Sequence, residues 1–137
     1  MKILGINAFH PDSSACVLVD GEIKAAIEEE RIRRIKHWAG FPSNAIDECL
    51  KQSGINFNDL DFIAINRDPN AHIFEKIKFT MKNRPALKSV LSRVGNRKEI
   101  GSISKILSDQ FLINQLKIEK KINNVEHHIA HLSSTYH

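Results

Sequence analysis

The chain contains 137 residues, of which 42% are hydrophobic and 26% are charged, with a formal net charge of +4. This composition is ordinary for one soluble domain with its own core, and the absence of any run of about 18 apolar residues excludes a transmembrane helix. The short apolar start lacks the central region of a signal peptide, and two cysteines without a CxxC spacing indicate reduced thiols, so a cytoplasmic protein is expected.

The first part of the chain predicts a three-stranded antiparallel meander. Apolar runs at 2–9 and 15–19 are separated by the turn-forming segment 10–14, His-Pro-Asp-Ser-Ser. Asp20-Gly21 is a strong hairpin signal, and residues 22–27 supply the returning strand. The turn at 10–14 is polar and rich in hydroxyl groups, so it is well placed to offer hydrogen-bond donors to a phosphate.

The next part predicts a helix and a further strand. Residues 28–37 are dense in charge, and their three glutamates beside a cationic cluster are either a salt-bridged surface turn or one wall of a polar site. Ser43 is expected to cap a helix that runs to about Gln52, with Gly54 just past its end. Residues 61–66 are short and apolar enough to be a strand, and this order predicts a mixed sheet with helices packed on it.

Residues 69 to about 117 predict a helical insert between two strands, because apolar residues recur there at helical spacing. Within it, residues 76–98 contain eight Lys or Arg and no acidic residue. A basic block of this kind can bind nucleic acid, phosphate groups or an acidic surface, or it can be a solvated helix face.

The end of the chain carries a candidate metal site. Residues 121–126 predict a strand that leads into the segment VEHHIAHLSSTY at 125–136. On a helix, His127 and His131 lie one turn apart on the same face, so both rings can reach one divalent metal. Alternatively, one histidine caps the helix and another is a buried, hydrogen-bonded ring. Two imidazoles do not fill a coordination shell, so further ligands must come from elsewhere.

Common nucleotide and hydrolase motifs are absent from the sequence. It has no glycine-rich loop of the Walker or Rossmann kind, which disfavours a P-loop enzyme. No serine lies in a GxSxG motif, which disfavours an α/β-hydrolase.

Three stretches, in this order, resemble the amino-terminal part of the O-carbamoyltransferases of the nodulation-protein-U and cephalosporin-carbamoylation type. They are ILGINAFHPDSSACVLVDGEI, EEERIRRIKHWAGFPSNAIDECL and VEHHIAHLSSTY, and the basic segment with KNRPALKSVL also looks like members of this family. The resemblance implies an α/β fold, a lobe of the ribonuclease-H-like or actin-like ATPase superfamily. Its mixed sheet would open with the three-stranded antiparallel meander, with helices packed on it and the helical insert at about 69–117.

The resemblance also implies the extent of the domain. Residues 1–137 would be the amino-terminal part of the catalytic domain, and the second lobe and the domain that activates carbamoyl phosphate would lie outside this chain. The remainder of the full-length enzyme is therefore an expected partner, and the chain alone is expected to be inactive.

The reaction implied by the resemblance is carbamoyl transfer. Carbamoyl phosphate and ATP give a carbamoyl-adenylate, and the carbamoyl group passes to a hydroxyl of a small-molecule or sugar acceptor. Carried over residue by residue, His127 and His131 match the pair that binds the metal, for which Fe(II) is expected. No membrane partner is expected, and nucleic acid is not an expected partner of this reaction.

The resemblance assigns roles in the turn and in the charged segment as well. His10 matches the histidine that faces the reacting carbamoyl group, and Lys36 matches the lysine that contacts the adenylate, although His37 could take the role given to Lys36. A neutral imidazole can accept the proton of the acceptor hydroxyl, and a lysine can stabilise negative charge on the carbonyl oxygen or the departing phosphate. Asp12, Ser13 and Ser14 would then orient His10 or contact phosphate.

Two alternatives belong to other classes of protein. The first is a relative of the enzymes that transfer a threonylcarbamoyl group to tRNA, with residues 76–98 gripping the RNA backbone. The second is a non-enzymatic basic module that uses the same block to bind nucleic acid or another protein. A steep salt dependence of RNA binding would favour the first of these.

Overall fold

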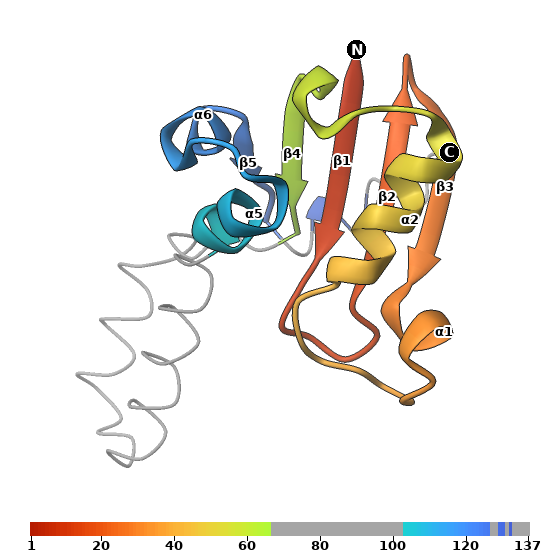
Figure 1. Cartoon of the computed structure of the whole chain (residues 1–137). Helices are drawn as coiled ribbons and strands as arrows, with labels where there is room; N and C mark the ends of the chain where they lie inside the picture. The colour runs from red at the N-terminus through yellow and green to blue at the C-terminus, as the bar shows by residue number, and fades with distance from the viewer. Residues whose placement is uncertain (67–102, 127–128, 131, 133–137) are drawn as a thin grey trace, which may run out of the picture.

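The computed structural model describes residues 1–66, 103–126, 129, 130 and 132 (Figure 1). The basic block at 76–98 and most of the expected helical insert lie outside the described residues, as do His127 and His131. None of the helices within the described ranges is both long and apolar enough to cross a membrane.

The chain opens with the predicted meander. Strands β1 (Lys2–Asn7), β2 (Ser14–Val19) and β3 (Glu22–Glu28) are consecutive and antiparallel. Asp20 and Gly21 both have positive φ, 52° and 87°, as the tight turn of a two-residue hairpin requires. The prediction from Asp20-Gly21 is therefore confirmed.

Two parallel strands complete a mixed sheet. Strand β4 (Phe62–Ile65) pairs with β1, and β5 (Ile122–Asn124) pairs with β4, which gives the order β3-β2-β1-β4-β5. Because β1, β4 and β5 run in the same direction, their carboxyl ends meet at one edge of the sheet, the lower end in Figure 1. The α/β class and the mixed sheet predicted from the sequence are confirmed.

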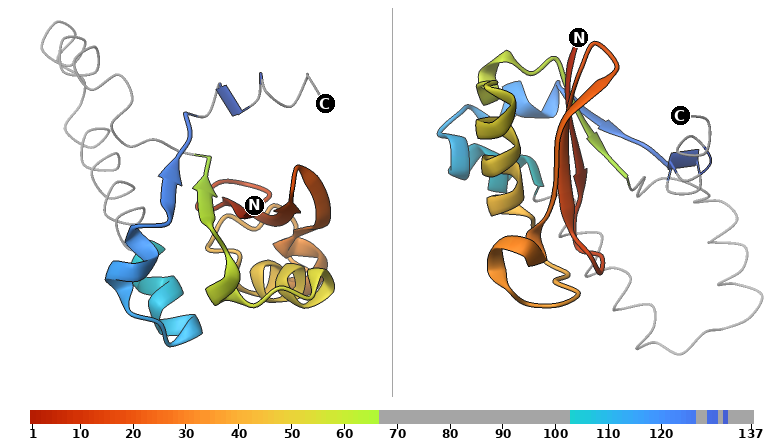
Figure 2. Two further views of the ribbon diagram at one scale, coloured as in Figure 1. Left: turned by 90° about the horizontal axis from the view of Figure 1, so that it is seen from above. Right: turned by 90° about the vertical axis from the view of Figure 1, so that its right-hand side faces the viewer.

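The helices pack on one face of the sheet. Helix α2 (Ser43–Ser53) buries Ala45, Ile46, Cys49 and Leu50, and residues of β1, β2 and β4 join them in the core. Helices α5 (Ile103–Phe111) and α6 (Gln115–Glu119) lie on the same side, as the right-hand view of Figure 2 shows. The stacked rings of Phe57, in the short 3-10 helix η1 (Phe57–Asp59), and Phe111 join α5 to this layer, with centroids 4.1 Å apart.

The start of α2 differs from its prediction. Ser43 is the first helical residue and not the cap; the cap position is Pro42, which has no side chain that can accept a hydrogen bond. The carboxylate of Glu29, the first residue of helix α1 (Glu29–Arg33), accepts the N–H of Ala45 at 2.7 Å instead. The other end follows the prediction, because Gly54 ends α2 in the left-handed conformation with φ of 67°.

Candidate functional site

The turn between β1 and β2 and the first residue of β2 together carry four of the predicted site residues. Ser13 is completely buried, and its hydroxyl lies 2.9 Å from the carbonyl oxygen of His10 and 2.8 Å from that of Gly40. The Ser13 hydroxyl therefore stabilises the turn itself. Asp12 adopts a φ of 64°, and its carbonyl oxygen accepts the Asn7 side-chain amide at 3.1 Å, while Ser14 begins β2.

His10 is exposed at the tip of this turn, and its Nδ1 lies 3.1 Å from the carbonyl oxygen of Pro11. A carbonyl oxygen only accepts hydrogen bonds, so this contact requires the proton on Nδ1. The neutral ring then carries its lone pair on Nε2. In this tautomer His10 can take a proton at Nε2, as the role that the resemblance implies for it would require.

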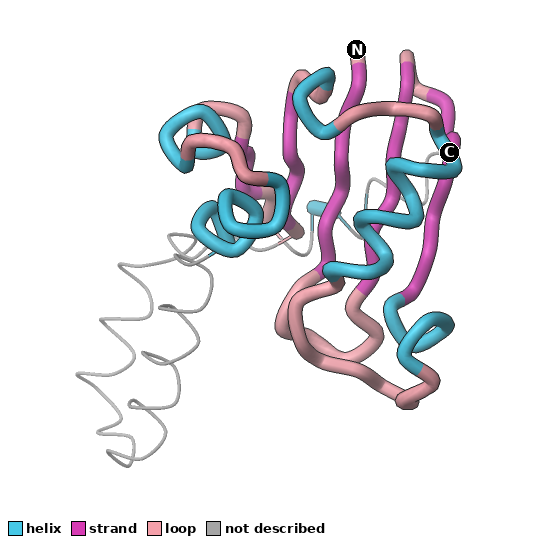
Figure 3. The backbone as a smooth tube through the Cα atoms, viewed as in Figure 1, coloured by secondary structure: helices cyan, strands magenta, loops and turns pink. Residues whose placement is uncertain are grey.

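Lys36 is exposed on the loop at 34–42, which joins α1 to α2. Backbone hydrogen bonds hold this loop against the turn that carries His10; they join Phe9 N to Gly40 O (3.1 Å) and Ser13 N to Trp38 O (3.0 Å). Figure 3 shows the turn and the loop together at the lower end of the sheet, beyond the carboxyl end of β1. The structure thus brings together the two segments that carry His10 and Lys36.

Glu29 holds together the two helices that flank the loop with Lys36. Its carboxylate is completely buried and accepts hydrogen bonds from Arg33 Nε, Asn44 Nδ2 and Ala45 N, each at 2.7 Å. The Arg33 guanidinium also lies over the ring of Trp38, 4.5 Å from its centroid. A single buried carboxylate therefore joins α1 to the start of α2, on either side of the loop with Lys36.

The described residues contain one cluster with the composition of a metal site. Ligand atoms of Asp12, Glu30 and His37 lie within 4.8 Å of one another. His37 Nδ1 is 2.9 Å from Asp12 Oδ1, and the backbone N–H of His37 donates to Glu30 Oε2 at 3.1 Å. These contacts account for the cluster as a hydrogen-bonded ion pair, and the hydrogen bond to Asp12 raises the pKa of His37 above its ordinary value.

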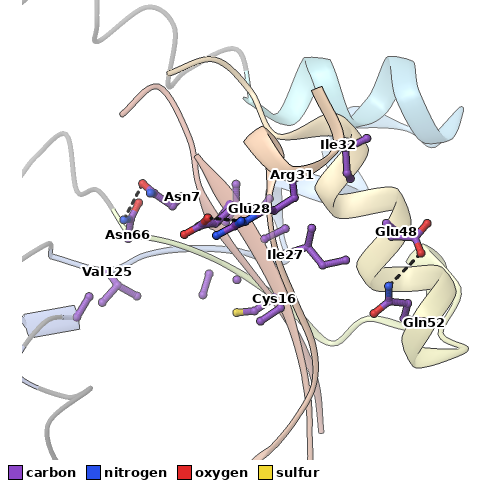
Figure 4. Close-up of a pocket in the computed structure, with 17 residues that line it drawn as sticks. Asn7, Cys16, Ile27, Glu28, Arg31, Ile32, Glu48, Gln52, Asn66 and Val125 are labelled. Carbon is purple, nitrogen blue, oxygen red and sulfur yellow. Dashed lines mark hydrogen bonds and ion pairs between the residues drawn. The ribbon is translucent and has the colours of Figure 1, made fainter. Parts of the chain in front are cut away.

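An open cavity of about 980 Å³ lies beside the carboxyl edge of the sheet and extends around β3 (Figure 4). Asn7 at the end of β1 and Asn66 just after β4 face each other across this edge, with Asn66 Nδ2 donating to Asn7 Oδ1 at 3.0 Å. The lining of the cavity includes the small residues Gly5, Cys16 and Ala64. It also includes the charged pair Glu28 and Arg31. Ligands of α/β sheets commonly bind at such an edge.

The chain continues from the carboxyl end of β5 into the segment with the predicted metal pair. His127 and His131 themselves lie outside the described residues, but Ile129 and Ala130 are helical. The Glu126 side chain accepts the N–H of Ile129 at 3.0 Å, and the Glu126 carbonyl oxygen accepts the N–H of Ala130 at 3.0 Å. Ala130 lines the cavity together with Val125, so these residues lie beside the polar edge.

The sequence prediction missed Asn7, Asn66 and Glu29. Asn7 and Asn66 each follow an apolar run, so polar residues directly after strands were the available signal. That signal was ambiguous because only the structure shows β1 and β4 to be neighbours. Glu29 could not be separated from Glu28 and Glu30, since the side chain that becomes buried depends on where α1 begins.

Comparisons with known proteins give a consistent result. The sequence model described as Carbamoyltransferase N-terminus matches residues 2–137. An uncharacterized protein, sll1178, of Synechocystis sp. (strain ATCC 27184 / PCC 6803 / Kazusa) is 45% identical over 67 residues, 49% of this chain and 11% of that protein. Nodulation protein NolNO of Sinorhizobium fredii (strain NBRC 101917 / NGR234) is 43% identical over 58 residues, 42% of this chain and 8% of that protein. The alignments thus cover only a small part of these relatives.

Proposed function

The chain belongs to the Carbamoyltransferase N-terminus family, and from this membership we propose that it is the amino-terminal part of an ATP-dependent O-carbamoyltransferase. The family match over residues 2–137 carries this proposal. The whole enzyme would form carbamoyl-adenylate from carbamoyl phosphate and ATP and pass the carbamoyl group to a hydroxyl of a small molecule or sugar. The fold would be a lobe of the actin-like ATPase superfamily, and a mixed sheet that opens with an antiparallel meander agrees with it.

His10 would act as the general base. As the acceptor oxygen forms its bond to the carbamoyl carbon, the bond from that carbon to the phosphate oxygen breaks and AMP leaves. The proton of the acceptor hydroxyl passes to Nε2 of His10, because Nδ1 already donates to the Pro11 carbonyl. His10 is exposed at the turn, so a substrate can approach the residue.

Lys36 and the turn would stabilise negative charge on the substrate. An ammonium group near the reacting carbon stabilises charge on the carbonyl oxygen or on the departing phosphate. Lys36 is exposed and is held on the same side of the sheet as His10. Asp12 and Ser14 would contact or orient the phosphate-bearing substrate, and the buried Ser13 would keep the turn in shape.

His127 and His131 would hold the divalent metal, with Fe(II) as the expected ion. The donor set fits a metal of this kind, because two imidazoles four residues apart on a helix reach one ion. Val125 and Ala130, in the segment that carries both histidines, line the same cavity as Asn7 and Asn66. When bound, the ion would supply charge stabilisation to the phosphate groups.

Calorimetric titration of the chain with Fe(II) or Zn(II) tests the metal assignment. We expect one ion per chain and loss of that binding in the His127→Ala, His131→Ala double variant. The Asp12→Asn, Glu30→Gln double variant is the matched control, since it removes two ligand groups from the other cluster. Binding that survives the histidine variant but not the control would overturn the assignment.

Transfer of ¹⁴C-labelled carbamoyl phosphate by the full-length protein tests the activity. We expect ATP-dependent formation of a labelled carbamoyl ester on a small-molecule hydroxyl. The His10→Gln variant should form little or no product. Transfer to tRNA would support the threonylcarbamoyl alternative. RNA binding that depends steeply on salt, without any transfer, would support the basic module.

A further inference from the structure

One side-chain pair joins the turn that carries His10 to the loop that carries Lys36. His37 Nδ1 and Asp12 Oδ1 are 2.9 Å apart, and the side chains are 75% and 51% exposed. Both residues also have positive φ, 64° for Asp12 and 54° for His37, which is uncommon for residues other than glycine. The backbone on each side is therefore held in a conformation that presents the two side chains to each other.

The two residues of this pair lie close in sequence to the two candidate site residues. Asp12 is two residues after His10, and His37 directly follows Lys36. The backbone bonds between turn and loop involve Phe9, Ser13 and their partners, and no described backbone bond between them involves residues 10–12. The contact between Asp12 and His37 thus adds a side-chain link at the exposed tip, next to His10 and Lys36 in the chain.

The surroundings of His37 favour its charged form. Asp12 on the turn accepts its ring hydrogen bond, and Glu30 on α1 contributes a second negative charge. The hydrogen bond and charge of Asp12 are the main causes of the raised pKa of His37, with Glu30 as a smaller cause. The pair consequently contributes its full stabilisation below the ordinary histidine pKa and loses the charge contribution as pH rises through the raised value.

We infer that Asp12 and His37 are positioning residues, whose ion pair holds His10 and Lys36 in the arrangement that carbamoyl transfer needs. Protonated His37 keeps the tip of the turn against the loop, and its deprotonation weakens that hold. The roles of His10 and Lys36 rest on the proposed function, but the pairing and its effect on the two segments do not. The inference can therefore be tested without any assay of transfer.

Trp38 is a built-in reporter of the pair, because it is the only tryptophan of the chain and directly follows His37. Its emission is recorded between pH 5 and 9 on the whole chain, with EDTA present so that no metal occupies the cluster of Asp12, Glu30 and His37. We expect one transition, with a midpoint above the ordinary histidine pKa. The transition moves to lower pH in Asp12→Asn and disappears in His37→Gln.

The same pH titration, followed by NMR, measures whether the protonation of His37 affects the segments that carry His10 and Lys36. The backbone amides of His10 and Lys36 should each show a step at the pKa of His37. In His37→Lys, which keeps a positive charge opposite Asp12 throughout this range, both amides should lose that step. Glu22→Gln, which removes an exposed ion pair with Lys24, is the matched control and should leave every titration unchanged.

Two results would overturn the inference. One is a Trp38 transition that persists in His37→Gln or keeps its midpoint in Asp12→Asn. The other is a His10 backbone amide without a step at the pKa of His37, because the pair would then not affect the candidate base. The proposed function fails separately, if the full-length protein transfers no carbamoyl group although His10 follows His37 as expected.

Discussion

Removing the Glu29 carboxylate should destabilise the chain more than any other single loss of charge in its described part. Glu29 is completely buried and accepts three hydrogen bonds of 2.7 Å, from Arg33, Asn44 and the backbone of Ala45. In Glu29→Ala the half-buried Arg33 keeps its charge without this partner, and the first turn of α2 loses its cap.

The magnitude follows from these contacts. Breaking a buried ion pair by removing one partner costs about 3–5 kcal/mol, and the loss of a helix cap alone costs about 1 kcal/mol. Because Arg33 remains partly solvated and stays near Trp38, we expect about 3 kcal/mol for Glu29→Ala. Glu29→Gln keeps one acceptor oxygen and should cost about 2 kcal/mol.

Urea unfolding followed by circular dichroism measures both values. The control is Glu22→Gln, whose exposed ion pair with Lys24 should contribute little to the free energy of unfolding. Arg33→Ala and the Glu29→Ala, Arg33→Ala double variant complete a double-mutant cycle. The double variant should lose less free energy of unfolding than the two single variants lose in sum. A Glu29→Ala chain as stable as the Glu22→Gln control would refute this account of how α1 and α2 are joined.

Four further predictions concern the sheet, the helix α2 packed on it and the polar edge. Gly5→Ala should destabilise the chain by about 1–3 kcal/mol, because the added Cβ would lie 2.7 Å from Cys16 Sγ; thermal unfolding should show the loss, and Cys16→Ala should recover part of it. Burial raises the pKa of Cys49 to about 11, so its thiol should react with an aromatic disulfide at pH 8 only after unfolding. Between pH 9 and about 11 the unfolded chain loses the Cys49 proton before the folded chain does, so the free energy of unfolding should fall as pH rises. Cys49→Ala should reduce the slope of stability against pH, and an unchanged slope would contradict the burial of the thiol. Asn7→Ala should lower the free energy of unfolding more than Asn66→Ala, because Asn7 forms hydrogen bonds with both Asn66 and the Asp12 carbonyl. The loss should be about 1 kcal/mol per hydrogen bond. Equal losses in urea unfolding would argue against that network.

The meander and α2 were predictable because their signals are local. Asp20-Gly21 fixes a two-residue hairpin, and the alternation of apolar residues around it decides which face each strand buries. Gly54 likewise ends α2 where the sequence predicts, since a left-handed residue is needed there. The cap of α2 was not predictable in this way, because its acceptor is Glu29, fourteen residues before the helix begins.

The candidate site shows the same division. The sequence by itself determined which residues have suitable chemistry, among them His10 in its polar turn, Lys36 in its charged segment and the spacing of His127 and His131. Only the tertiary structure decided that the His10 turn lies against the Lys36 loop and that Asn7 meets Asn66. The reason is physical: short-range spacing fixes local conformation, whereas contacts between distant segments depend on which strands pair and which helix covers them.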